Sequence, residues 1–179
     1  ITDATIATGD IADSAVTVAK TSGVGVTSSS QFRLSATLGG DANPIANNWE
    51  EVDTDGYGGV GTAVSQSSGI FTFPSTGFWL IRITAGTKHD NTNNYGTISI
   101  DSTVNNSSYN SAADANTSYT ANPGADQYKT TSCEFMFDVT NTTTHKVRFS
   151  VFQQNNDANT IGNSGNNSTV ATFIRLGDT

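Results

Sequence analysis

The chain has 179 residues, of which 35% are hydrophobic and only 13% are charged, so most of its polarity comes from Asn, Ser, Thr and Gly. This composition is typical of a loop-rich β protein rather than a helical one. The formal net charge of -8 argues against nucleic acid or an anionic membrane surface as a partner, because both repel an acidic protein. No apolar run is long enough to cross a bilayer, so we expect no membrane insertion.

The first segment of the chain is an internal repeat. Its apolar positions recur every five residues, at Ile1, Ile6, Ile11 and Val16. A period of five matches neither a helix nor a strand, and one thin apolar stripe cannot bury itself, so it needs copies of itself or a larger surface. We predict that residues 1–25 form a stem or anchoring arm, most simply three-stranded, with a disordered linker as the alternative. Residues 26–31 then form a hinge.

From residue 32 onward the sequence alternates between strand and turn signals. The predicted strands cover residues 32–38, 48–52, 70–73, 78–83, 95–100, 133–139, 146–153 and 170–176. Val147, Phe149 and Val151, for example, alternate with polar or outward-facing residues. About eight strands without helical periodicity indicate an all-β head over residues 32–179, built as a two-sheet antiparallel sandwich or jelly roll.

The most apolar stretch runs from Gly69 to Gly86. Two alternating runs flank Pro74–Gly77, whose proline and glycine favour a turn, so we predict a hairpin. The second run is apolar on both faces and must be covered on both, by a second sheet and by a neighbouring subunit. The residues expected in the core or in subunit contacts are Phe71, Phe73, Phe78, Trp79, Leu80, Phe149 and Phe173.

Nothing in the sequence points to catalysis. We interpret His89 and His145 as surface residues of loops, and the chain has no nucleophile elbow, zinc-binding or phosphate-binding motif. Cys133 is the only cysteine of the sequence, so an internal disulfide is excluded, and we interpret it as a buried small hydrophobic residue. We therefore expect no enzymatic activity and no cofactor.

The long polar segment from Asp101 to Thr131 is the best candidate for recognition. Tyr95, Tyr109, Tyr119 and Tyr128 lie in it or at its edge. Tyrosine among Asn and Ser is the composition of recognition loops, and it suits sugars, whose faces stack on aromatic rings. The alternative is structural, with the tyrosines pinning a long loop onto the sandwich or the next subunit. A second polar segment, Asn155 to Ser168, is read as a solvated tip.

One set of residues carries a family resemblance. Gly69, Phe71, Phe73, Pro74, Gly77 and Phe78, with Phe173 and Leu176 in the last strand, resemble the signature of complement globular heads and the tumour necrosis factor superfamily. The resemblance covers residues 32–177 and implies a ten-stranded jelly roll that assembles as a tight trimer. The chain departs from the signature at Phe78, where a tyrosine is usual, and in the Asp101–Thr131 insertion. Related heads often hold calcium near the trimer top, and Asp53, Asp55, Asp90 and Asp101 are the candidates for such a site here.

The repeated leader, in turn, looks like the stems of bacteriophage fibre and virion decoration proteins. Leader and head together predict a non-enzymatic, homotrimeric viral structural protein at the virion surface. The arm would attach to other virion proteins, and the head would project outward, where it could bind host-surface glycan. A secreted bacterial adhesin with a complement-like head, or a carbohydrate-binding module, is the alternative.

Overall fold

The computed structural model describes residues 25–89, 95–120, 125–154 and 158–179. Twelve strands and no helix occur within these ranges. The strands are β1 (Ser29–Leu34), β2 (Ala36–Gly39), β3 (Trp49–Glu51), β4 (Ser65–Ser67), β5 (Ile70–Thr72), β6 (Gly77–His89), β7 (Tyr95–Thr103), β8 (Asn110–Ser118), β9 (Gln127–Val139), β10 (Lys146–Gln153), β11 (Asn159–Asn163) and β12 (Thr169–Gly177). The all-β prediction is confirmed.

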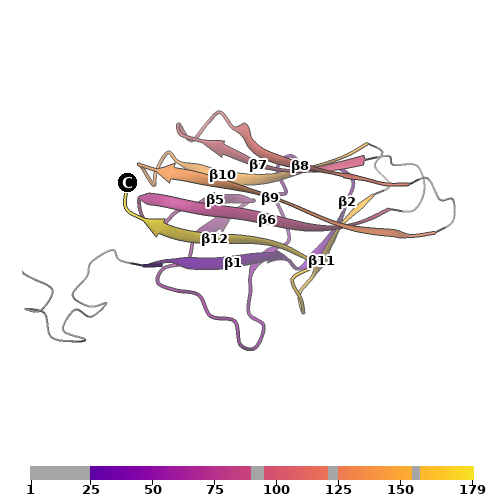
Figure 1. Cartoon of the computed structure of the whole chain (residues 1–179), viewed down its shortest axis with the longest axis horizontal. Coiled ribbons are helices and arrows are strands. Elements are labelled where there is room, and N and C mark those ends of the chain that lie inside the picture. The colour runs from indigo at the N-terminus through magenta and orange to yellow at the C-terminus, as the bar shows by residue number, and fades with distance from the viewer. Residues whose placement is uncertain (1–24, 90–94, 121–124, 155–157) are drawn as a thin grey trace, which may run out of the picture.

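The strands form two antiparallel sheets that run along the long axis of the molecule (Figure 1). Sheet A has the order β2-β11-β6-β12-β1-β3, with β9 on the other edge of β6. Sheet B has the order β4-β5-β10-β7-β8. β6 is the organising strand of sheet A, because it pairs with β9 over its whole length and with β12 and then β11 along its other edge.

The core between the sheets is aromatic. Phe71 is fully buried, and its ring centre lies 5.1–5.4 Å from those of Phe32, Trp49, Phe149 and Phe173. These rings come from strands of both sheets, and each projects inward because successive side chains of a strand alternate between its faces. Of the residues predicted for core or subunit contact, five are in the core, namely Phe71, Phe73, Trp79, Phe149 and Phe173. Phe78 and Leu80 lie on the outward face of sheet A.

The predicted hairpin around Pro74–Gly77 is wrong. β5 belongs to sheet B, where it pairs with β4 and β10, whereas β6 belongs to sheet A. The intervening turn therefore crosses from one sheet to the other. Gly77 makes this crossing with a φ of 136°, and a Cβ there would lie 2.4 Å from the carbonyl oxygen of Gly177. Turn residues indicate a change of direction, but they do not indicate which strand becomes the hydrogen-bonding partner.

The two polar segments that were predicted to be loops contain strands. β8 and the beginning of β9 lie within the Asp101–Thr131 segment, and β11 lies within the second one. Small residues such as Ala113 and Ala115 pack against the edge of the core, and Thr160 of β11 is fully buried. These strands contain few of the β-branched and aromatic residues that are typical of strands, so their sequences give only a weak strand signal.

The N-terminal boundary of the sandwich also differs from the prediction. β1 begins at Ser29, and both Ser28 and Ser30 are buried, so part of the predicted hinge at 26–31 lies in sheet A. The predicted arm falls almost entirely on residues 1–24, and its positions Ile1, Ile6, Ile11 and Val16 lie outside the described residues. None of the described segments forms a helix with the length and apolar character that a membrane crossing needs.

Candidate functional site

The outward face of sheet A, which points away from sheet B, carries an unusual row of apolar side chains. The strand register places Leu80 of β6 between Met136 of β9 and Ile174 of β12. Phe78 and Leu176 lie next to them at the end of the sheet, and 39% and 43% of their surfaces are exposed. Met136 is 58% exposed. We call these five residues the apolar row.

Beyond the apolar row this face is mainly polar, although Val170 of β12 also lies on it. Two residues beyond Leu80 along β6, Arg82 lies opposite Glu134 of β9. Two residues further, Thr84 lies opposite Ser132. Further along, the Lys88 ammonium lies 5.9 Å from the ring centre of Tyr128. Apolar surface is thus concentrated at one end of the face. A concentration of exposed apolar side chains on a soluble protein marks an interaction surface rather than a random solvated face.

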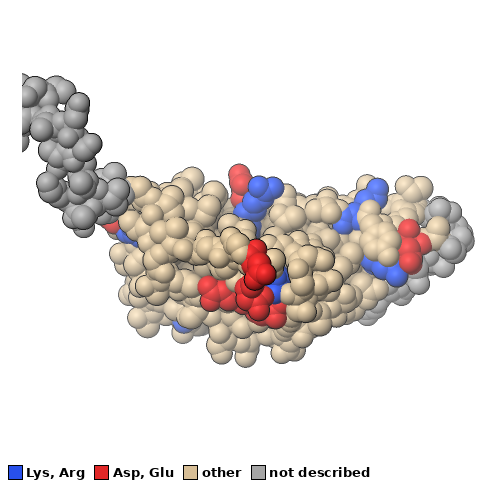
Figure 2. All heavy atoms as spheres, turned by 90° about the horizontal axis from the view of Figure 1, so that it is seen from below, with Lys and Arg blue, Asp and Glu red and all other residues tan. Residues whose placement is uncertain are grey.

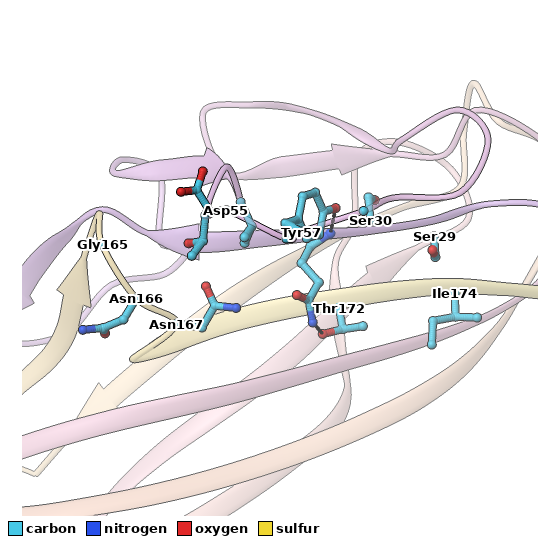
Figure 3. A pocket seen from close by; sticks show the side chains of 14 residues that line it. Ser29, Ser30, Asp55, Tyr57, Gly165, Asn166, Asn167, Thr172 and Ile174 are labelled. Atoms are coloured by element: carbon cyan, nitrogen blue, oxygen red, sulfur yellow. Dashed lines mark hydrogen bonds between the residues drawn. The ribbon is translucent and has the colours of Figure 1, made fainter.

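A groove with a volume of about 650 Å³ adjoins the apolar row over β1 and β12. Figure 3 shows Thr172 and Ile174 along β12, with Tyr57 on one side of the groove and Asn167 on another. Gln31 of β1 donates a hydrogen bond from its side-chain amide to the Thr172 hydroxyl at 3.0 Å. Since Ile174 belongs both to the groove and to the apolar row, the two features form one continuous surface.

The groove exists because the chain leaves sheet A after β3. Val52 still donates its backbone N–H to Gln31, and Val60 returns to pair with Ser29, so residues 53–59 project from the edge of β1 (Figure 1). Within this loop the Tyr57 hydroxyl accepts the Gln31 backbone N–H at 2.9 Å. A side-chain oxygen therefore replaces the strand carbonyl that the departing chain would otherwise supply.

A buried cation fixes the base of the same loop. Arg33 is 1% exposed, donates to Glu50 at 2.7 Å and to the Thr54 hydroxyl at 2.6 Å, and pairs with Asp53. The hydrogen bond to Glu50 is the main cause that raises the pKa of Arg33 above its ordinary value. Figure 2 shows acidic side chains gathered near the middle of the face seen from below, with further basic and acidic side chains towards one end.

The structure separates the four tyrosines proposed for ligand binding. Tyr95 is exposed on the outward face of sheet B, and Tyr109 lies under the Arg148 guanidinium at 4.4 Å. Tyr128 is exposed on the outward face of sheet A. Tyr119 is buried and donates to the Thr87 hydroxyl at 2.7 Å, and burial raises its pKa. These residues form no single recognition surface.

The candidate calcium ligands have other roles in the structure. Asp53 pairs with Arg33, and Asp101 accepts hydrogen bonds from Ser150 and Arg148. Asp55 lines the groove, while Asp90 lies outside the described residues. No group of three or more His, Cys, Asp or Glu side chains suited to a metal ion occurs in the described part of the chain.

The two histidines and the cysteine pack against neighbouring side chains and backbone of the sandwich. His145 stacks on Phe137, and His89 is buried at the end of β6 with its ring 3.9 Å from that of Tyr119, so the prediction of a surface histidine is wrong for His89. Cys133 is half-buried on β9. Its burial raises the pKa of the thiol to about 11, and the Asp114 carboxylate adds to the shift. A thiol with such a pKa stays protonated and is a poor nucleophile at neutral pH.

Comparison with solved structures identifies the fold of the chain. No protein family model and no curated protein matches the chain. Solved structures do: an Eiger TNF from S. frugiperda has a TM-score of 0.62 at 10% identity, covering 84% of this chain and 93% of its own. Murine APRIL at pH 8.5 has a TM-score of 0.59 at 13% identity, covering 83% of this chain and 98% of its own. The fold is a TNF-like jelly roll. At these identities the similarity establishes the fold of the chain and nothing finer.

Within this TNF-like jelly roll, sequence reasoning missed several residues of the outward face. Met136 and Ile174 were not singled out, although each is an apolar residue in the outward phase of its strand. Tyr57, the one tyrosine outside the polar insertion and its edges, was passed over and yet lies in the groove. The Asp55-Gly56 pair beside it is a turn signal, but no local pattern indicates that the loop folds back onto β1.

Proposed function

We propose that this chain is the homotrimeric head of a non-enzymatic viral fibre or decoration protein, displayed at the virion surface, and that it contacts host glycan. The observation that carries the proposal is the apolar row. Met136, Leu80 and Ile174 lie side by side on three neighbouring strands, facing away from the core. Covering such a surface removes apolar area from water at roughly 25 cal/mol per Å².

The geometry suits a closed ring. Met136 lies on β9, an edge strand of sheet A, while the groove lies towards β1 on the far side of the same face. Contact between two unlike surfaces of identical chains is heterologous and gives a ring when the rotation closes. We infer that the β9 side of one copy covers the groove side of the next, and the resemblance of the Gly69–Phe78 signature implies three copies.

The arm supports the viral part of the proposal. The stripe of Ile1, Ile6, Ile11 and Val16 is too thin to be buried within one chain, but three aligned stripes cover one another or bind a virion surface. An antibody against the chain should therefore label virus particles from the same source by electron microscopy. Label on bacterial cells and none on particles would instead support a secreted adhesin.

Sedimentation equilibrium of the full chain tests the assembly. We expect a mass three times the 18.7 kDa of the chain. Met136→Glu places a charge in the apolar row, so it should give a monomer with an unchanged circular dichroism spectrum, because Met136 is largely exposed in the single chain.

Val104→Glu is the matched control, because Val104 is 61% exposed but lies outside sheet A in the segment between β7 and β8. This variant should remain trimeric. A parent chain that sediments as a monomer, or a Met136→Glu variant that is as trimeric as Val104→Glu, would overturn the proposed assembly.

A further inference from the structure

The outward face of sheet B carries an exposed aromatic pair. Tyr95 of β7 and Phe152 of β10 are 41% and 45% exposed, and their ring centres lie 5.8 Å apart at an interplanar angle of 39°. Phe152 stands directly across from Thr97 in the strand register, so both rings project on the side away from the core. Two large apolar rings held together in water form a platform on which a flat apolar surface can stack.

Beside this platform lies a hollow of about 250 Å³ that Phe152 itself lines. Most of its other lining residues are polar, and they include Asp41, Asn43 and Thr97 of β7, with Val151 as the further apolar one. The Asp41 and Asn43 side chains stand here because Ala42 between them pairs with Val151 and extends sheet B beyond the end of β5. The hollow is of the size of a single sugar ring and smaller than the usual cavity for a drug-sized ligand.

The polar groups of the hollow are held in fixed positions and keep capacity for a ligand. Asp41 Oδ1 accepts the Gln153 backbone N–H at 2.6 Å, and no hydrogen bond occupies its Oδ2 among the described residues. Asn43 Oδ1 accepts from Arg148 at 2.9 Å, which orients the amide and leaves its NH₂ group as a donor. The Thr97 hydroxyl donates to Asn116 at 2.6 Å and retains acceptor capacity. A carboxylate acceptor, an amide donor and a hydroxyl acceptor match the alternating donors and acceptors of neighbouring sugar hydroxyls.

The charges select against an acidic ligand. Asp41 is the one charged residue among those that line the hollow. Arg148, which donates to Asn43 of the hollow, also pairs with Asp101 at 3.3 Å and lies over the ring of Tyr109. A sialic or uronic acid would therefore meet the Asp41 carboxylate while the Arg148 cation is already paired, which is unfavourable.

We propose that this hollow and its aromatic platform bind a neutral saccharide, with one sugar face stacked on Phe152 and Tyr95 and its hydroxyls bonded to Asp41, Asn43 and Thr97. The site deepens the proposed function, because it gives the projecting head a glycan contact. It lies on the sheet opposite the apolar row, so assembly through sheet A leaves it accessible in every copy.

The test uses the full chain in saturation-transfer NMR with methyl glycosides of glucose, galactose, mannose and N-acetylglucosamine, and with sialyllactose as the acidic probe. A single neutral sugar should bind with a dissociation constant on the order of millimolar, as expected for a small ligand on an open site. Phe152→Ser and Asp41→Ala should each weaken binding by about tenfold or more, because each removes one of the two kinds of contact.

Tyr128→Ser is the matched control, because Tyr128 is a more exposed aromatic residue on the opposite sheet face. It should bind the neutral sugar as the parent does. Circular dichroism and sedimentation of every variant separate this outcome from misfolding and from loss of the proposed assembly. The inference is overturned if no neutral sugar binds to a trimeric parent, if sialyllactose binds more tightly, or if Phe152→Ser and Asp41→Ala bind as well as Tyr128→Ser.

Discussion

Phe71 should be the most sensitive position of the core. It is fully buried, and its ring centre lies within 5.4 Å of the centres of four aromatic rings from both sheets. Phe71→Ala removes a whole ring from between the sheets, and neighbouring rings held by their own strands can collapse only partly into the space. We therefore expect a loss of about 3–5 kcal/mol in the free energy of unfolding.

That loss is large compared with the whole stability of a domain, which is about 5–15 kcal/mol. For a chain of this size it corresponds to a fall in Tm of about 6–20 °C. Urea unfolding followed by circular dichroism, at one protein concentration because assembly contributes to stability, measures the change. Phe152→Ala is the control, since this phenylalanine is 45% exposed and its loss should cost less than about 1 kcal/mol. Equal losses for the two variants would refute the assignment of Phe71 as the centre of the core.

Three further predictions concern the crossing between the sheets, the half-buried thiol and the loop at the groove. Gly77→Ala should lower the Tm, because its Cβ would lie 2.4 Å from the Gly177 carbonyl oxygen at a φ of 136°; an unchanged Tm would contradict the crossing geometry. Cys133 has its pKa raised from 9.0 to about 11 in the folded chain, so its contribution to stability is present below pH 9 and is lost as the pH rises through 11. Urea midpoints from pH 8 to 11 should therefore fall more for the parent than for Cys133→Ala. Tyr57→Phe removes the acceptor of the Gln31 N–H and should lower the free energy of unfolding, measured in urea, by about 1 kcal/mol. An unchanged free energy would mean that the hydroxyl does not replace a strand carbonyl as the acceptor of this N–H.

The sequence by itself determined the class of the fold and much of the core. The alternation of Val147, Phe149 and Val151 predicted a strand at 146–153, and β10 has those bounds. The apolar residues of 78–83 predicted a strand, and Trp79, Ile81 and Ile83 on its inward face are fully buried. Cover of its outward face by a neighbouring subunit stays a prediction. Hydrophobic periodicity predicts these strands because the buried side chains themselves stabilise them, so the local sequence shows which residues face the core.

The tertiary structure alone decided which strands pair and which surfaces result. Ile70–Thr72 and Gly77–His89 are neighbours in sequence but lie in different sheets, since hydrogen-bonding partners come from distant segments such as β10 and β9. The same long-range register places Met136, Leu80 and Ile174 in one row and brings Asp41 beside Phe152. Strand pairing depends on the relative placement of backbones that are far apart along the chain, and no local pattern of residues carries that information.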